Sequence, residues 1–208
     1  GKKVASSRED TSPAYRLKIA EQLLEGLAAL HAMGIAHGDI KEENVLLKRN
    51  NGGEVIADIS DFEGVATKEE IDQLPVSEPN PLGGYTPSHA LKSDLRAELK
   101  AFRAEDTAKV FELRKKRDVF ALGACLYRLM TGLFPYELDQ DDYPEYDSTI
   151  LRRGLIQGPY LRSFTYEQKK LNYELLMGML MPHPDRRCSA EEAVLLYAKL
   201  KRIIFGDA

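Results

Sequence analysis

Residues 37–47 read HGDIKEENVLL, and this stretch decides how the chain around it is organised. It begins with titratable and amide side chains and runs into Val45-Leu46-Leu47-Lys48, a pattern that is typical of a β-strand. A second run of this kind covers 55–59, and NNGG at 50–53 between the two runs is a strong turn signal. The pattern predicts an antiparallel hairpin that presents polar residues at its base.

The predicted hairpin brings two distant oxygen-bearing side chains together. Asn44 immediately precedes the first strand and Asp61 follows the second, so antiparallel pairing places both at the same end. An amide oxygen and a carboxylate can hold a divalent cation, and beside Asp39 and Lys41 they form an oxygen-rich site that suits Mg²⁺ and phosphate. Asp39 could accept a proton from a hydroxyl group, and Lys41 could neutralise a phosphate as a point charge.

A mainly α-helical body is predicted around this hairpin. Ser12-Pro13 supplies a cap and a first-turn proline for a long amphipathic helix that stops at Gly34. The segment 118–131 is apolar nearly all round, as in a central buried helix, and Gly132 ends it. Three further helical patterns cover about 148–154, 166–181 and 189–204.

Polar stretches interrupt the helical pattern. From Gly64 to Ser88, prolines and a glycine pair predict an extended loop of a length usually reserved for function. The charged segment 89–117 carries apolar residues at helical spacing, so we expect one or two exposed helices, with the basic run 114–117 on a solvated face. The acidic stretch 137–147 predicts a loop. This loop is either a solvent-exposed connection without a further role, or it selects basic substrate sequences by its charge.

The composition is that of one globular domain. The chain has 208 residues, 43% hydrophobic and 30% charged, with a net charge of -4, so nothing global indicates a nucleic-acid partner. Its longest apolar stretch is interrupted by Arg128 and is too short to span a membrane. Cys125 and Cys188 lack metal-ligand spacing, so we expect reduced, structural cysteines and a cytoplasmic or otherwise intracellular location.

Several blocks of the sequence, in this order, resemble protein kinases of the Ser/Thr type. Residues 37–47 resemble the catalytic loop H-R-D-L-K-P-E-N-x-L-L, and ISDF at 59–62 resembles the strand that enters the D-F-G motif. DVFALG at 118–123 resembles the start of the central kinase helix, and LMTGLFPY at 129–136 its exit. HPDRRCS at 183–189 resembles the segment D-P-x-x-R-x-[ST]. The resemblance implies the carboxyl-terminal lobe of such a kinase, with a mainly α fold.

The resemblance also assigns roles to residues. It implies Asp39 as the catalytic base, Lys41 as support for the transferred phosphate, and ATP and Mg²⁺ as cofactors. The residues that would bind this nucleotide and its metal are Lys41, Asn44, Leu46 and Asp61, with Asn44 and Asp61 holding Mg²⁺ and Leu46 beneath the adenine. Structural support would come from His37, Phe62, Asp118 and Arg187. Asp118 would accept backbone N–H groups of the catalytic loop or cap its helix, and His37 equally suits a satisfied core histidine.

The chain departs from the family pattern at several positions. In the catalytic loop, residues 37–47, Gly38 stands where the family has an arginine. In the activation segment, residues 61–88, Glu63 stands where the family has a glycine. Ser88 stands where the family has a glutamate that pairs with the position of Arg187, so we predict that this arginine finds another carboxylate or carbonyl partner. The segment 89–117 is then interpreted as a helical insertion.

No glycine-rich loop precedes the first helix, so we expect the ATP-covering lobe to come from the same or another polypeptide. The leading hypothesis is a kinase that phosphorylates Ser or Thr of a protein substrate, with the 208-residue chain inactive alone. Two alternatives stay open. One is a catalytically silent scaffold, which Gly38 and Glu63 favour, and the other is a small-molecule phosphotransferase of the aminoglycoside-kinase type, which H-G-D favours.

Overall fold

The computed structural model describes residues 12–75 and 83–206. Its helices are α1 (Pro13–Ala32), α2 (Lys68–Gln73), α3 (Lys92–Arg103), α4 (Thr107–Thr131), α5 (Ser148–Gln157), α6 (Tyr166–Met179) and α7 (Ala190–Phe205). The strands are β1 (Ile35–Ala36), β2 (Val45–Arg49), β3 (Val55–Ile59), β4 (Ala66–Thr67), β5 (Glu137–Leu138) and β6 (Pro144–Glu145). The fold is therefore mainly helical with small antiparallel sheets, as the sequence predicts.

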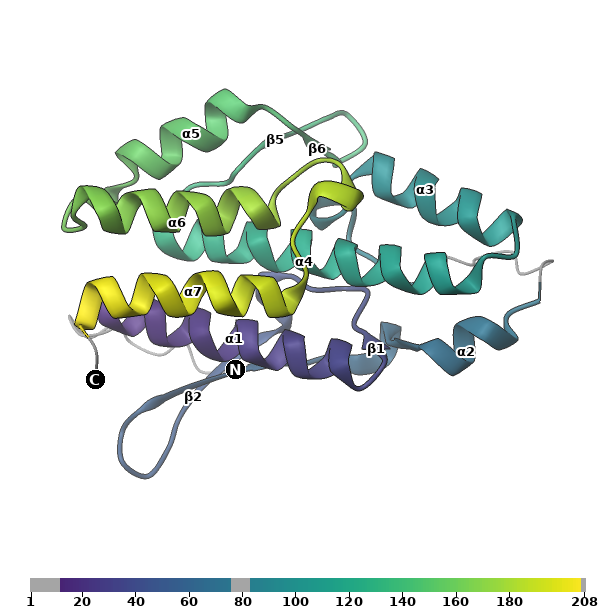
Figure 1. Ribbon diagram of the computed structural model, residues 1–208, viewed down its shortest axis with the longest axis horizontal. Helices are drawn as coiled ribbons and strands as arrows, with labels where there is room; N and C mark the ends of the chain where they lie inside the picture. The colour runs from purple at the N-terminus through teal and green to yellow at the C-terminus, as the bar shows by residue number, and fades with distance from the viewer. Residues whose placement is uncertain (1–11, 76–82, 207–208) are drawn as a thin grey trace.

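Helix α4 runs through the middle of the molecule, with α1 and α7 on one side of it and α5 and α6 on the other (Figure 1). Its second half is buried on nearly every face and contributes to one large apolar cluster together with α1, α6 and α7. Gly132 ends the helix at a φ of 77°, a left-handed conformation that glycine adopts without steric cost. The predicted central helix is therefore confirmed over 118–131.

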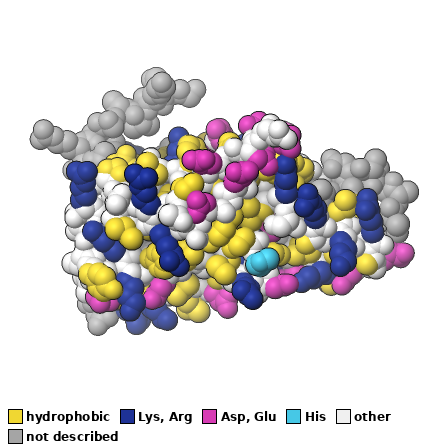
Figure 2. All heavy atoms as spheres, turned by 90° about the horizontal axis from the view of Figure 1, so that it is seen from above, with side chains coloured by type: hydrophobic (Ala, Val, Ile, Leu, Met, Phe, Trp, Pro, Cys, Tyr) yellow, Lys and Arg dark blue, Asp and Glu magenta, His cyan; other side chains and the backbone are white. Residues whose placement is uncertain are grey.

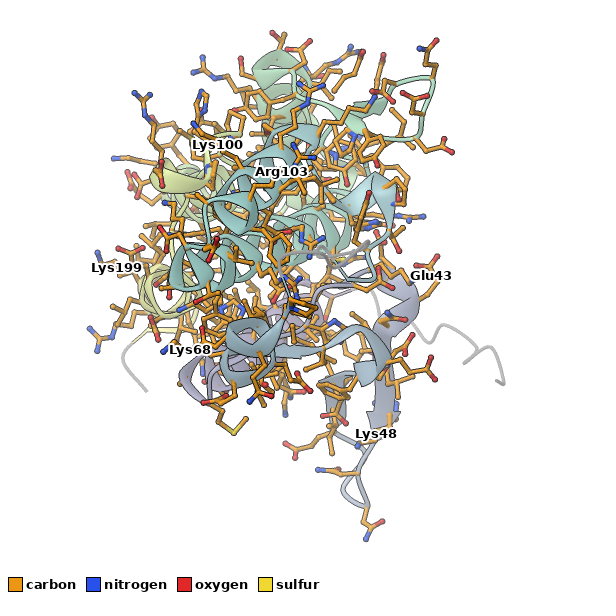
Figure 3. All side chains as sticks on the ribbon, turned by 90° about the vertical axis from the view of Figure 1, so that its right-hand side faces the viewer. Glu43, Lys48, Lys68, Lys100, Arg103 and Lys199 are labelled. Carbon is orange, nitrogen blue, oxygen red and sulfur yellow. The ribbon has the colours of Figure 1, made fainter. Side chains whose placement is uncertain are left out.

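The amino-terminal helix and the hairpin also form where the sequence predicts them. The Ser12 side chain accepts a hydrogen bond from the Tyr15 amide at 3.1 Å, with Pro13 in the first turn. Strands β2 and β3 pair antiparallel, with Val45 opposite Ile59. Figure 3 shows this hairpin projecting from the helical body, with Glu43 at its base and Lys48 farther out.

The expectation of an extended loop over 64–88 is wrong for its first part. Strand β4 pairs with β1, and α2 follows it directly. A capping box starts this helix, because Thr67 accepts from the Glu70 amide while the Glu70 carboxylate accepts from the Thr67 amide at 2.8 Å. The sequence carries this signal as a Thr and a Glu three positions apart, inside a stretch dominated by its prolines. Residues 76–82 of the expected loop lie outside the described residues.

Helices form within 89–117 as the sequence predicts, but the expectation that they are exposed is wrong. Helix α4 begins at Thr107, about three turns before the predicted start at 118, with Asp106 as its cap. Its first turns pack with α2 and α3 around a second apolar cluster that contains Ile71, Phe102 and Phe111. The segment is therefore part of the folded body, and its interpretation as an insertion stays a prediction.

The basic run 114–117 does not lie on a solvated face as a whole. Arg114 and Arg117 are buried beside Glu98 of α3, whose carboxylate lies 4.0 Å and 3.6 Å from their Nε atoms. Burial raises the pKa of Glu98 to about 7, against the attraction of the two arginines. The spacing of apolar residues does not reveal that these two arginines are buried, because their burial depends on a carboxylate from another helix.

Arg187 finds the partners that the sequence predicts it must have. Its guanidinium is buried and donates to Asp94 of α3 at 2.7 Å and 3.3 Å. It also donates to the carbonyls of Met181 and Lys116, at 2.9 Å and 2.7 Å. The carboxylate that pairs with Arg187 therefore lies six positions beyond Ser88, in the segment interpreted as an insertion.

The surface carries charges of both signs. Figure 2 looks down on the side of α3 and α5, where acidic side chains gather on one part and basic ones are spread among apolar patches. The acidic stretch 137–147 forms the β5–β6 hairpin, and Lys92 of α3 pairs with Asp139 at 2.8 Å and with Asp141 at 2.7 Å. Part of the acidic charge is therefore neutralised within the chain. Among the described residues, no helix is long and apolar enough to cross a membrane.

Candidate active site

Asp118 holds the stretch 37–47 against the central helix. Its Oδ2 accepts the His37 amide at 2.8 Å, and its Oδ1 accepts the Gly38 amide at 2.8 Å. The imidazole Nε2 of His31 lies 3.0 Å from the same Oδ2. Asp118 lies inside α4, so its interpretation as a helix cap is wrong, and Asp106 has that place instead. A buried carboxylate with three such partners fixes the start of the loop.

His37 connects this loop to the end of strand β3. Its ring is fully buried, with Nε2 placed 3.0 Å from the Ser60 carbonyl and Nδ1 placed 3.3 Å from the Asp39 amide. The carbonyl can only accept and the amide can only donate, so the proton belongs on Nε2. The ring centroid of Phe62 lies 5.3 Å from that of His37, and the Phe62 side chain is otherwise half exposed. His37 is thus a satisfied core histidine that also positions the two loops.

Asp39 and Lys41 form the polar centre of the site, and Thr86 joins them. The Asp39 carboxylate accepts from Lys41 Nζ at 2.7 Å and from Thr86 Oγ1 at 2.6 Å, and Lys41 also donates to Thr86 at 3.0 Å. Burial alone would raise the pKa of Asp39, but the hydrogen bonds from Lys41 and Thr86 outweigh it and lower this pKa. The hydrogen bond to Asp39 in turn raises the pKa of Lys41. The carboxylate is therefore ionised at neutral pH, with its oxygens oriented.

Sequence reasoning missed Thr86 as a site residue. The sequence places it 45 positions after Lys41, in the proline-rich stretch that the pattern assigns to a loop. The resemblance uses only the nearby Ser88, as the position of the family's glutamate. The structure shows instead that this threonine contacts Asp39 and Lys41, and no local pattern predicts this contact.

Asn44 and Asp61 lie at the same end of the hairpin. The Ser60 amide donates to the Asn44 carbonyl at 2.8 Å, which continues the β2–β3 ladder by one pair. Asn44 is buried and its Nδ2 donates to the Asp39 carbonyl at 2.8 Å, so its Oδ1 is left without a donor among the described residues. Asp61 is exposed, in a left-handed conformation at φ 68°. A free amide oxygen and a free carboxylate are hard oxygen ligands, so this donor set fits Mg²⁺.

The backbone explains one departure from the family pattern. Gly38 has a φ of 85°, and a Cβ there would lie 3.0 Å from the carbonyl oxygen of Gly64 and 3.4 Å from that of Gly84. Any side chain at this position would be strained, so an arginine is excluded in this conformation. Glu63 lies exposed in the 3-10 turn Phe62–Gly64.

Two surfaces flank the Asp39 centre. Leu46 of β2, which the resemblance implies beneath the adenine, is 54% exposed and offers an apolar surface. On another side, a cavity of about 420 Å³ is lined by Lys41, Glu42, Glu43, Thr86, His89 and Phe134, among others. The site thus combines an ionised carboxylate, a lysine and a pair of oxygen ligands with an apolar edge and an open cavity.

Comparison with known proteins gives consistent matches. The family model described as "Protein kinase domain" matches residues 2–196. Serine/threonine-protein kinase ksp1 of Schizosaccharomyces pombe is 28% identical over 181 residues, which are 86% of this chain and 34% of the relative. Serine/threonine-protein kinase stk11 of Xenopus laevis is 30% identical over 173 residues, 82% of this chain and 33% of the relative. The chain therefore spans about a third of the length of these curated relatives.

Solved structures with a similar fold include the Rad53 kinase domain with SCD2. One such structure has a TM-score of 0.55 at 18% identity and covers 92% of this chain and 59% of that chain. Another, in complex with AMPPNP, has a TM-score of 0.52 at 20% identity and covers 86% and 56%. At this identity the likeness concerns the fold.

Proposed function

This chain belongs to the protein kinase family, and we propose that it is the larger lobe of a kinase that transfers the γ-phosphoryl group of Mg·ATP to Ser or Thr of a protein substrate. The observation that carries the proposal is the Asp39 carboxylate, oriented by Lys41 at 2.7 Å and by Thr86 at 2.6 Å. It lies on a loop that Asp118 fixes from the central helix. A carboxylate held this way suits general base catalysis.

The chain's own residues have distinct tasks in this reaction. Asp39 orients the substrate hydroxyl and accepts its proton as the hydroxyl oxygen bonds to phosphorus and the ADP oxygen leaves. Lys41, whose raised pKa keeps it charged, stabilises the negative charge of the transferred group. Asn44 and Asp61 would hold Mg²⁺, which neutralises phosphate charge when bound.

The substrate class follows from two lines of support. Curated relatives are named serine/threonine-protein kinases, and Lys41 two positions after Asp39 matches that class by resemblance. The open cavity of about 420 Å³ is lined by Lys41, Thr86 and Phe134, among others, and offers room for a peptide beside the base. We assign this cavity to the protein substrate.

We assign the ATP-covering lobe to the same or another polypeptide, over the surface of Leu46. Leu46 and Leu47 are 54% and 46% exposed, and both are apolar. Covering them with adenine and a second lobe removes apolar area from water, which favours the assembly. The isolated chain is then expected to fold, to bind ATP weakly and to transfer phosphate negligibly.

Asp61→Ala tests the metal assignment. In the polypeptide that contains both lobes, we expect the affinity for Mg·ATP to fall at least about tenfold, because a ligand to Mg²⁺ is lost. Calorimetric titration with Mg·ATP and with ATP in chelator measures the effect. Asp58→Ala, on strand β3 of the same hairpin, is the matched control and should bind normally. Equal binding by both variants would remove Asp61 from the site.

Thr86→Ala tests how the base is oriented. Loss of a hydrogen bond to a charged group costs about 1.5–3 kcal/mol, so kcat should fall about 10- to 100-fold. The same hydrogen bond lowers the pKa of Asp39, so the acid limb of the kcat/KM pH profile should move to higher pH. Thr86→Ser keeps the hydroxyl and should restore both values. A profile unchanged in Thr86→Ala would contradict the role given to Thr86.

A full-length protein with no Mg·ATP binding and no transfer would favour the scaffold instead. Transfer to an aminoglycoside in place of a protein substrate would favour the small-molecule alternative. The assays therefore separate the three hypotheses.

A further inference from the structure

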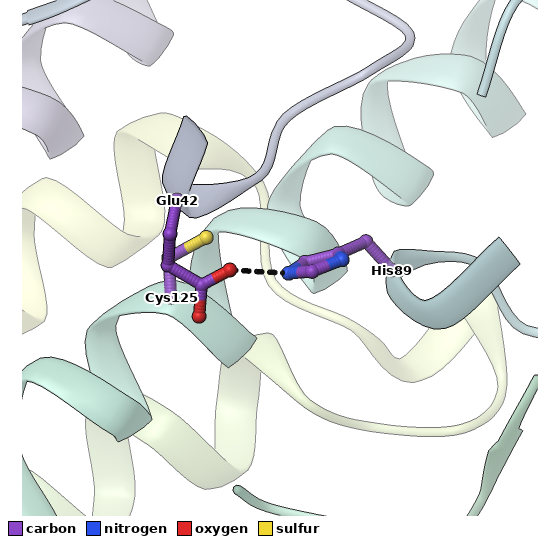
Figure 4. A group of neighbouring side chains, drawn as sticks. All are labelled: Glu42, His89 and Cys125. Carbon is purple, nitrogen blue, oxygen red and sulfur yellow. Dashed lines mark hydrogen bonds and ion pairs between the residues drawn. The ribbon is translucent and has the colours of Figure 1, made fainter. Parts of the chain in front are cut away.

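Three metal-ligating side chains meet next to the substrate cavity (Figure 4). Glu42 comes from the 3-10 turn Glu42–Asn44, His89 from the 3-10 turn Pro87–His89, and Cys125 from α4. Their ligand atoms all lie within 4.8 Å of one another. We propose that Glu42, His89 and Cys125 form a site for one divalent cation of the Zn²⁺ class, separate from the Mg²⁺ ligands Asn44 and Asp61.

The spacing of the His89 and Glu42 ligand atoms is close to what such a cation needs. His89 Nε2 lies 2.9 Å from Glu42 Oε2, with only a proton between them. In a tetrahedral zinc site, with metal bonds of about 2.1 Å to N and O, these two atoms would lie about 3.4 Å apart. Moving these two atoms apart by about 0.5 Å therefore makes room for the cation between them. His89 and Cys125 are 8% and 5% exposed, so both ligands are held in the packed interior.

The surroundings orient the ligands as in known metal sites. The other ring nitrogen of His89, Nδ1, lies 3.1 Å from Ser88 Oγ, which can fix the tautomer that presents Nε2. Arg128 Nη1 lies 3.3 Å from Glu42 Oε1 and leaves Oε2 for the cation. Mutation of residues that hydrogen-bond to metal ligands in this way typically changes metal affinity by about 10- to 100-fold.

The donor chemistry selects the class of cation. Imidazole and thiolate prefer Zn²⁺, whereas Mg²⁺ prefers oxygen ligands only. One carboxylate and one thiolate together match the charge of a divalent ion. Without metal, burial and the charges of Glu42 and Glu43 raise the pKa of Cys125, so its thiol is protonated. Cation binding therefore releases the thiol proton.

The cluster is also accessible, because it stands between two cavities. Glu42 and His89 line the cavity of about 420 Å³, while Glu42 and Cys125 line an apolar cavity of about 260 Å³. Three protein ligands leave a fourth position for water. Glu42 follows Lys41 and His89 lies three positions after Thr86, so a bound cation would connect the two segments that orient Asp39.

Zn²⁺ titration of the metal-free, reduced chain in excess Mg²⁺ tests the proposal, with a competing chelator to report affinity. We expect about one ion per chain, a raised melting temperature and proton release. With Co²⁺ as probe, the absorption spectrum should contain a thiolate-to-cobalt charge-transfer band. His89→Gln and Cys125→Ser should each weaken binding at least about tenfold. The matched controls His183→Gln and Cys188→Ser, outside the cluster, should bind as the original chain does.

The outcomes are decisive without any activity assay. Absence of saturable Zn²⁺ binding would leave the cluster as a His-Glu hydrogen bond beside a buried thiol and overturn the proposal. Binding that survives in both His89→Gln and Cys125→Ser, or a Co²⁺ spectrum without a thiolate band, would overturn it as well. If Cys125→Ser fails to fold, His89→Gln and the Co²⁺ spectrum of the original chain still decide. Phosphate transfer can succeed or fail independently of each result.

Discussion

Asp39→Asn should lower phosphate transfer by about 10²- to 10⁴-fold, the usual contribution of a general base. Asparagine keeps the shape of the side chain but cannot take up the proton of the substrate hydroxyl. Lys41 and Thr86 now donate to different oxygens of the carboxylate, at 2.7 Å and 2.6 Å, and asparagine keeps one oxygen for Lys41 while its amide can donate to the Thr86 hydroxyl. Binding of Mg·ATP should therefore change little. Steady-state kinetics on the two-lobed polypeptide, with a thermal-shift titration of Mg·ATP, measure both quantities.

The matched control is Asp58→Asn, which makes the same chemical change on strand β3 of the same hairpin. It should leave kcat unchanged, since Asp58 pairs with Lys48 near the surface. An Asp39→Asn variant that retains more than about a tenth of the original kcat would show that Asp39 is not the base. Loss of Mg·ATP binding in the same variant would instead indicate that the site has collapsed.

Breaking the Arg187–Asp94 pair should have the largest effect on stability. Both side chains are buried, with 0% and 1% of their surface exposed, and their shortest contact is 2.7 Å. Asp94→Ala leaves a buried guanidinium without its carboxylate, so the free energy of unfolding should fall by about 3–5 kcal/mol. Denaturant unfolding followed by circular dichroism measures this change.

A double variant separates the value of the pair from the cost of an unpaired charge. Burial raises the pKa of Asp94 although Arg187 attracts its charge, so desolvation offsets much of the attraction. Asp94→Leu combined with Arg187→Met should therefore recover most of the stability that Asp94→Ala loses. The exposed pair Lys109–Asp185 is the control, and Asp185→Ala should have no measurable effect. A single Asp94→Ala variant as stable as the original chain would contradict the expected cost.

The sequence predicted the elements whose signals are local. The cap at Ser12, the turn at 50–53 and the apolar run 118–131 each depend on neighbouring residues, and the helix and strands form there. The pairing of β2 with β3 follows from the same local pattern. It places Asn44 and Asp61 at one end of the hairpin, as the sequence predicts.

The tertiary structure alone decided which side chains complete the site. Thr86 reaches Asp39 across a stretch whose local pattern indicates only a loop. Asp94 and Glu98 meet buried arginines from other elements, although the sequence pattern predicts exposed helices there. Each of these contacts joins residues that are distant in the chain, so its free energy depends on burial and on the partner.

The sequence by itself therefore determined the helical body and the hairpin that carries Asp39, Asn44 and Asp61, because hydrophobic periodicity and turn residues act over short distances. The resemblance of its motifs indicated the family. Only the tertiary structure decided the third residue of the Asp39 centre, the carboxylate that pairs with Arg187 and the Glu42, His89 and Cys125 cluster. Burying a polar group costs free energy unless it finds a partner. These partners come from distant segments, so no pattern along a single segment reveals them.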